Sequence, residues 1–155
     1  MPATRNPEKI RVLLVDDHAL VRQGLRKVLE ADPRIEVVGE VADGEAAIEA
    51  AFRLRPTVAL IDIGLPGING IEATSRILRR MGDVAVLMVS MHADELYLRR
   101  SLKAGATGYV LKDSEDLELV RAVTSVARGE SYFSPALHPM LLSGYLAQQS
   151  RSARA

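Results

Sequence analysis

Polar residues with the chemistry of a catalytic or metal-binding site stand directly after apolar runs in this sequence. Each run is short and mostly apolar, as is typical of a buried strand. A carboxylate at the end of a buried strand is costly unless something pairs with it. In open parallel sheets, the residues that follow the strands meet at one edge, where ligands bind. The residues in question are two neighbouring aspartates, Asp16 and Asp17, followed along the chain by Asp62, Ser90 and Lys112.

Three carboxylates, one hydroxyl and one ammonium group restrict the chemistry of such a cluster. The carboxylates repel one another unless a cation lies among them. A hard divalent ion such as Mg²⁺ takes carboxylate oxygens as ligands and keeps several waters. A carboxylate beside Mg²⁺ and a lysine can attack phosphorus and form an aspartyl phosphate, because both cations neutralise charge on the transferring oxygens. The residues therefore predict phosphoryl transfer to an aspartate, with the Ser90 hydroxyl near a phosphoryl oxygen.

Five apolar runs alternate with segments of helical periodicity. Four of the runs are continuous, which is typical of parallel strands covered on both faces. We therefore expect an α/β fold with a doubly wound, five-stranded parallel sheet. The expected strands are Ile10–Val15, Ile35–Val41, Thr57–Ile61, Val84–Val89 and Thr107–Leu111, and the expected helices lie near residues 18–31, 46–54, 71–82, 98–105 and 117–127.

The composition argues against several classes of protein. Lysine plus arginine and aspartate plus glutamate both number 20, so the formal net charge is zero. A general nucleic-acid or membrane-surface binder would normally show a basic excess. The absence of cysteine rules out disulfides, a thiol nucleophile and a thiolate zinc site. No apolar stretch is long enough to span a bilayer, and the first ten residues lack a signal peptide's apolar segment. We expect a soluble, cytoplasmic protein.

Four segments resemble the motifs of one known family. They read LLVDDHALVRQGL, LIDIGLPGINGIEA, VLMVSMH and GATGYVLKD, and they occur in order at the ends of the expected strands. Together they resemble a response-regulator receiver (CheY-like) domain, most closely that of the NarL/FixJ-type two-component regulators. The resemblance covers about residues 10–130. It implies a flavodoxin-like (βα)5 fold with strand order 2-1-3-4-5.

The resemblance implies a phosphoacceptor and a metal site. Asp62 matches the phosphoacceptor of the family. Asp17 matches a direct ligand of Mg²⁺ (or Mn²⁺), and Asp16 assists directly or through water. The backbone carbonyl of Gly64 matches a further ligand, and Asp62 itself completes the set.

The resemblance also implies the residues that respond to phosphorylation. Lys112 matches the lysine that pairs with the phosphoryl group, and Ser90 matches the switch hydroxyl. Tyr109 matches the aromatic residue that moves inward when Ser90 engages the phosphoryl group, although a tyrosine here is more often a packing residue. Asp113 stands where many receivers have a proline with a cis peptide bond, so that geometry is not carried over.

The family's partners and domain order supply further expectations. A sensor histidine kinase donates the phosphoryl group, and the receiver catalyses only its own phosphorylation and dephosphorylation. We expect a homodimer on phosphorylation, no nucleic-acid contact by this chain, and control of transcription through a DNA-binding helix-turn-helix domain outside it. Residues 1–9 are expected to be disordered, residues 10–130 to form the receiver, and residues 131–155 to be a tether with a short linker helix at Pro139–Gln148.

Each candidate residue also has a structural interpretation. Asp62 could cap the turn or the helix that follows it, and Asp16 and Asp17 could cap the first helix. His18 and His92 flank the site without metal-ligand spacing, so we expect surface or supporting roles for them.

Other functions fit the sequence less well. An aspartate-nucleophile phosphatase has a second aspartate two residues after the first, whereas Gly64 holds that place after Asp62. Neither nucleotide-binding pattern, G-x-G-x-x-G or G-x-x-x-x-G-K-[ST], occurs in the chain. A phosphorylation-independent, receiver-like interaction module usually lacks the acidic pair, the acceptor or the lysine, all of which are present. That module is the alternative to a phosphoacceptor.

Overall fold

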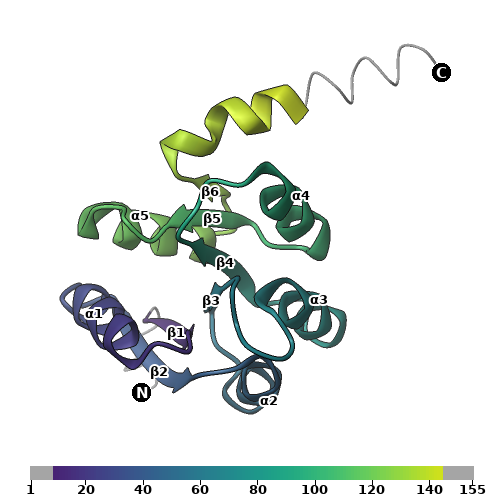
Figure 1. Cartoon of the computed structure of the whole chain (residues 1–155). Coiled ribbons are helices and arrows are strands. Elements are labelled where there is room, and N and C mark those ends of the chain that lie inside the picture. The colour runs from purple at the N-terminus through teal and green to yellow at the C-terminus, as the bar shows by residue number, and fades with distance from the viewer. Residues whose placement is uncertain (1–8, 145–155) are drawn as a thin grey trace.

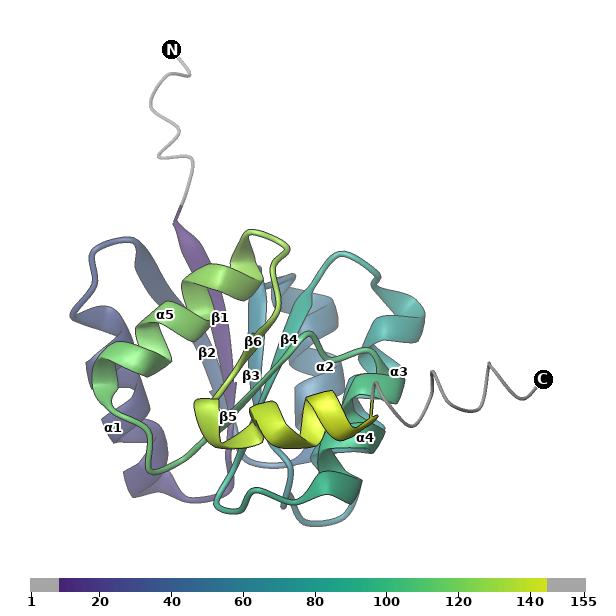
Figure 2. The same ribbon diagram turned by 90° about the horizontal axis from the view of Figure 1, so that it is seen from above.

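The architecture is a parallel sheet between two layers of helices (Figure 1, Figure 2). The computed structural model describes residues 9–144. Its strands lie in the order β2-β1-β3-β4-β5-β6, and every neighbouring pair is parallel. The predicted order 2-1-3-4-5 is confirmed, with one strand added beside β5. The strands are β1 (Ile10–Val15), β2 (Ile35–Val41), β3 (Val58–Asp62), β4 (Ala85–Ser90), β5 (Gly108–Leu111) and β6 (Tyr132–Phe133).

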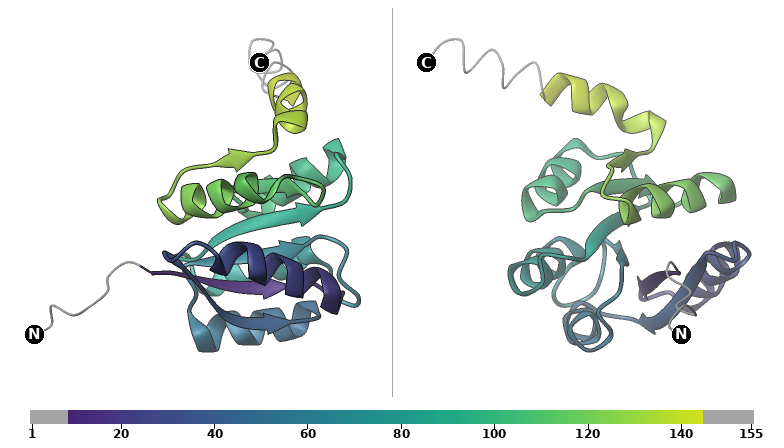
Figure 3. Two further views of the ribbon diagram at one scale, coloured as in Figure 1. Left: turned by 90° about the vertical axis from the view of Figure 1, so that its left-hand side faces the viewer. Right: turned by 180° about the vertical axis from the view of Figure 1, so that it is seen from behind.

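Helices cover both faces of the sheet. Figure 3 shows α1 and α5 together on one face, while α2, α3 and α4 cover the other. Within β1, Val12 and Leu14 pack into the core beneath α1 and α5, whereas Leu13 and Val15 pack beneath the other three helices. This burial on both sides explains why the strands are continuous apolar runs in the sequence. The helices are α1 (Ala19–Glu30), α2 (Gly44–Leu54), α3 (Gly70–Arg80), α4 (Glu95–Ala104) and α5 (Asp116–Ala127).

The sixth strand is the main departure from the expected fold. The sequence predicts a linker from residue 131, whereas β6 pairs with Gly108 and Tyr109 of β5. Farther along, Leu137 is fully buried in the core. A strand of two half-buried residues is too short to show an apolar pattern, and the nearby Ser134 and Pro135 are typical of a loop. Packing against the sheet and core therefore continues beyond residue 130.

A helix follows the sixth strand and runs from residue 138 to residue 144, the last described residue. Met140 and Leu141 pack against the core from this helix. Residues 145–148 of the expected linker helix and the tether after them lie outside the described residues, as do residues 1–8 of the expected disordered N-terminus. Within residues 9–144, no helix is long and apolar enough to cross a membrane.

The turn between β3 and α3 depends on close backbone packing. Gly70, the first residue of α3, lies so near the end of β3 that a Cβ atom would overlap the Asp62 carbonyl oxygen. Its amide donates a hydrogen bond to the Ile63 carbonyl at 3.1 Å. The Asn69 side chain caps α3 by accepting a hydrogen bond from Glu72 N at 2.9 Å. The start of α3 is thus fixed against the backbone of Asp62.

We expect Gly70→Ala to lower the free energy of unfolding by about 1–3 kcal/mol, because the added methyl group must displace the Asp62 backbone. Gly24→Ala is the matched control, since no atom lies within 4 Å of a Cβ at that exposed position of α1. This control should gain about 0.5–1 kcal/mol, the usual preference for alanine in a helix. Urea unfolding followed by circular dichroism measures both variants. Equal stability of the two alanine variants would contradict the close packing.

Candidate functional site

The residues that the sequence singles out meet at the carboxyl end of the sheet. Asp62 ends β3, Ser90 ends β4, and Lys112 directly follows β5. All three line an open pocket of ≈ 600 Å³. Asp16 and Asp17 follow β1, which is the neighbour of β3 in the sheet. The structure therefore brings all five residues into one site.

Lys112 connects the acidic residues of this site. Its ammonium nitrogen Nζ lies 2.9 Å from Asp16 Oδ2 and 3.3 Å from Asp62 Oδ2. The Asp16 and Asp62 side chains are 2% and 8% exposed, and that of Lys112 is 10% exposed. Water therefore does little to screen these ion pairs, and the Coulomb attraction within each is stronger than in an ion pair on the surface. Removal of the lysine would leave two buried carboxylates without their cation.

The two carboxylates control the protonation of Lys112. Burial by itself would lower the pKa of this lysine, but its close contact with Asp16 and the charges of Asp62 and Asp16 raise the pKa by more. The net result is a pKa above the ordinary value of 10.5. Lys112 is therefore a permanent positive charge at neutral pH, suited to stabilising an anion and unsuited to acting as a base.

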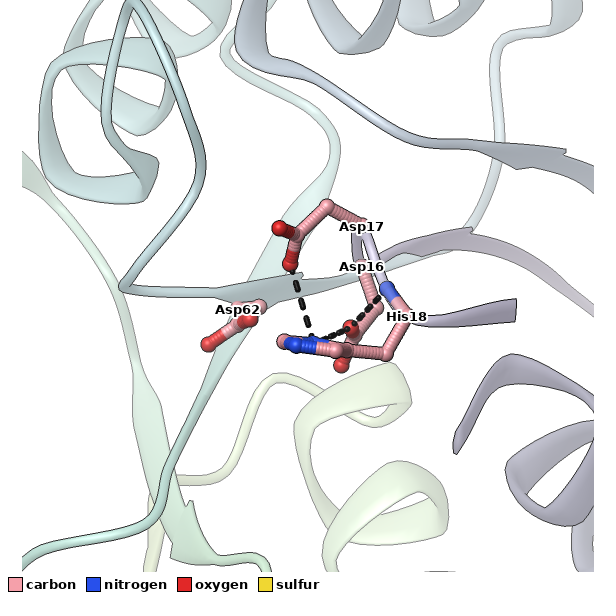
Figure 4. A group of neighbouring side chains, drawn as sticks. All are labelled: Asp16, Asp17, His18 and Asp62. Atoms are coloured by element: carbon pink, nitrogen blue, oxygen red, sulfur yellow. Dashed lines mark hydrogen bonds and ion pairs between the residues drawn. The ribbon is translucent and has the colours of Figure 1, made fainter. Parts of the chain in front are cut away.

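The acidic residues form a cluster that suits a divalent cation. Asp16, Asp17, His18 and Asp62 each offer a ligand atom, and these atoms all lie within 4.8 Å of one another (Figure 4). Carboxylate oxygens are the ligands that Mg²⁺ and Mn²⁺ favour. The donor set of the three aspartates therefore fits the predicted metal.

His18 lies closer to the acidic cluster than the sequence indicates. Its Nδ1 lies 3.2 Å from Asp16 Oδ1 and 3.1 Å from Asp17 Oδ1, although 66% of its side chain is exposed. Its backbone amide donates a hydrogen bond to Asp16 Oδ1 at 2.8 Å. This turn folds the imidazole back over the acidic pair. The position of His18 directly after Asp17 is a signal for this contact, but the spacing does not reveal the side-chain direction.

Asp62 is oriented by the turn after β3. Its Oδ1 accepts a hydrogen bond from Gly64 N at 3.2 Å, while Oδ2 faces Lys112. Asp62 thus takes part in the turn, which was its structural alternative, whereas the cap of α3 is Asn69. The Gly64 carbonyl remains a predicted metal ligand. No cis peptide bond occurs within residues 9–144, so the bond after Lys112 is trans.

Ser90 and Tyr109 lie on the neighbouring strands β4 and β5, where Tyr109 pairs with Met88 and Ser90 with Leu111. Ser90 is 7% exposed, and its Oγ accepts a hydrogen bond from His92 N at 3.2 Å. Tyr109 is fully buried, and its hydroxyl donates to the His92 carbonyl at 3.5 Å. Burial raises the pKa of Tyr109, against a smaller opposing effect of the Ser90 hydroxyl. Tyr109 thus already lies inside the fold, and its movement on phosphorylation stays a prediction.

Comparison with known proteins shows the family of this chain. Residues 12–124 match the family model for the response regulator receiver domain. The chain is 41% identical to the transcriptional regulatory protein DegU of Brevibacillus brevis, covering 90% of this chain and 59% of DegU. It is 37% identical to the nitrate/nitrite response regulator protein NarL of Escherichia coli K12, covering 96% of this chain and 69% of NarL.

A solved structure has the same fold as this chain. The two-component response regulator of the LuxR family from Aurantimonas sp. SI85-9A1 superimposes with a TM-score of 0.83 at 35% sequence identity. The match covers 88% of this chain and 97% of that one. By contrast, the chain spans only about 59–69% of the length of the two curated relatives.

We expect the Lys112 ammonium group to titrate above pH 10.5 in the absence of divalent cations, because its two carboxylate partners favour the charged form. Asp62→Asn should lower this midpoint, because the substitution removes the carboxylate charge that raises the pKa of Lys112. Asp83→Asn, at an exposed position before β4, should leave it unchanged. Carbon NMR of the lysine Cε follows the titration. A wild-type midpoint below 10.5 would show that burial outweighs the ion pairs.

Proposed function

The chain belongs to the response regulator receiver domain family, and we propose that its Asp62 accepts a phosphoryl group in a Mg²⁺-dependent reaction. The observation that supports this most strongly is the contact between Asp62 Oδ2 and Lys112 Nζ at the wall of an open pocket. The Asp62 carboxylate lines this open pocket, and the Lys112 ammonium group lies beside it. An incoming phosphoryl group would meet both the nucleophile and a positive charge for its oxygens.

The proposed reaction transfers a phosphoryl group from a histidine to Asp62. A carboxylate oxygen of Asp62 attacks the phosphorus of a phosphohistidine, and a new O–P bond forms. The bond between phosphorus and the imidazole nitrogen breaks, and the electron pair stays on that nitrogen. Lys112 then pairs with a phosphoryl oxygen, and Ser90, which lines the same pocket, can donate a hydrogen bond to another. Hydrolysis of the acyl phosphate later releases inorganic phosphate and restores the carboxylate.

The acidic cluster would hold the metal for this reaction. Asp17 and Asp62 would be direct ligands together with the Gly64 carbonyl, and Asp16 would act directly or through water. Bound Mg²⁺ would neutralise the charge that accumulates on the phosphoryl oxygens. Because Asp16 also pairs with Lys112, it ties the metal site to the lysine.

The partners follow from the same proposal. A sensor histidine kinase would supply the phosphoryl group, and the reaction would be confined to the chain's own aspartate, without turnover of a separate substrate. Phosphorylation would shift the Ser90 and Tyr109 region and favour a homodimer. DegU and NarL are regulators longer than this chain. We therefore propose that the parent protein is cytoplasmic and controls transcription through a DNA-binding output domain.

Incubation with acetyl phosphate and Mg²⁺ tests the proposal directly. We expect intact-mass spectrometry to show one phosphoryl adduct on the wild type, because the carboxylate, the metal and the lysine are all in place. Asp62→Asn should show none, and Asp83→Asn should behave like the wild type. An equal adduct on Asp62→Asn, or no adduct on the wild type, would favour the phosphorylation-independent interaction module instead.

Metal affinity gives a second prediction. Asp17→Asn should weaken binding of Mn²⁺, used in place of Mg²⁺, by about tenfold or more, because affinity follows the number of charged ligands. Free Mn²⁺ can be counted by electron paramagnetic resonance. Asp83→Asn removes the same charge far from the cluster, so it controls for net charge. Equal Mn²⁺ affinity of the two variants would show that Asp17 is not a metal ligand.

A further inference from the structure

The backbone that leads to Lys112 is held from both sides. On the β4 side, Lys112 N donates a hydrogen bond to the Ser90 carbonyl at 2.8 Å. On the other side, the preceding amide, Leu111 N, donates to Ser134 Oγ at 3.1 Å. Because β6 ends at Phe133, a side-chain hydroxyl here takes the place of a strand carbonyl. The backbone at Leu111 and Lys112 is therefore held by a hydrogen bond from Lys112 to Ser90 and one from Leu111 to Ser134.

Ser134 is built into the fold and does not serve its own helix. It is 2% exposed, and its amide donates to the Tyr109 carbonyl at 3.1 Å. It is the N-cap residue of a short 3₁₀ helix at Pro135–Leu137, yet its side chain makes no capping hydrogen bond there. Its hydroxyl instead accepts from β5 and lies 3.4 Å from Ser114 Oγ. A residue needed only to start a helix would use its side chain differently.

The chain beyond Ser134 is anchored by the same residue. Leu137 N donates to the Ser134 carbonyl at 2.9 Å, and the Leu137 side chain is fully buried. The ring nitrogen Nε2 of His138 lies 3.0 Å from the Phe133 carbonyl. The helix of residues 138–144 begins immediately afterwards (Figure 1). Ser134 thus lies between β5 and the start of this helix.

We propose that Ser134 is a positioning residue for Lys112, and that its hydrogen bond with Leu111 couples the state of Asp62 to the segment after β6. The inference rests on the proposed function. A phosphoryl group on Asp62 restrains the Lys112 side chain, and Ser134 restrains the backbone of the preceding residue, Leu111. Because coupling between two sites is reciprocal, binding at Asp62 strengthens the Ser134 hydrogen bond, and loss of that bond weakens binding at Asp62.

Beryllium fluoride with Mg²⁺ is a suitable probe, because it forms a phosphoryl-like adduct on a carboxylate. Hydrogen exchange of the wild type should slow at the amides of Leu111 and Ser134 when the adduct forms. The Ala127 amide, in the last turn of α5, serves as an internal reference that should not change. Unchanged exchange at Leu111 and Ser134 in a protein that binds the probe would overturn the coupling. A wild type that does not bind the probe would instead contradict the proposed function.

Matched variants separate positioning from stability. Ser134→Ala should weaken beryllium fluoride affinity by about fivefold or more, within the usual range for coupled sites. Ser131→Ala makes the same chemical change at an exposed position before β6 and should bind like the wild type. If Ser134→Ala lowers only the unfolding temperature, its role is structural and the proposal is wrong.

Discussion

The ion pairs of Lys112 with Asp16 and Asp62 are the constraint on which the rest of the site depends. Two carboxylates and an ammonium group lie together with little access to water, and such a group is stable only while every charge keeps its partner. The three side chains lie at the carboxyl ends of three different strands, so the pairing requires a specific order of β1, β3 and β5 along the sheet. The fold can thus be understood as the frame that keeps these three charges within contact distance while one carboxylate stays open to the pocket.

Parallel strands buried on both faces supply that frame. Their apolar runs fix the strands in the core, and the polar residues that follow are then carried to one edge. The packing of Gly70 against Asp62 closes the turn after β3, and β6 with Ser134 holds the far edge of β5. The residues nearest the chemistry are therefore positioned by backbone contacts from several elements, which limits how far any one of them can move alone.

The sequence predicts the strands and the site because both depend on local patterns. An apolar run followed by Asp62 or Lys112 is visible without a structure, and the parallel arrangement then brings those residues together. The sequence does not predict the two-residue β6, because this strand is held by pairing with β5 and has no apolar pattern of its own. The sequence also does not predict that the His18 side chain lies over the acidic pair or that Tyr109 is fully buried, because side-chain direction is decided by tertiary packing. The role of the Gly64 carbonyl and the movement of Tyr109 remain predictions.

The central claim is that Asp62, among the clustered carboxylates, is the group that forms the acyl phosphate. The residue that carries the phosphoryl group can be identified directly. Borohydride reduction of the phosphorylated protein converts an aspartyl phosphate to homoserine, and peptide mass spectrometry then locates the homoserine. We expect homoserine at position 62 and nowhere else. Homoserine at position 16 or 17, or phosphate retained on His18, would contradict it, because Lys112 and the turn would then be positioning the wrong group.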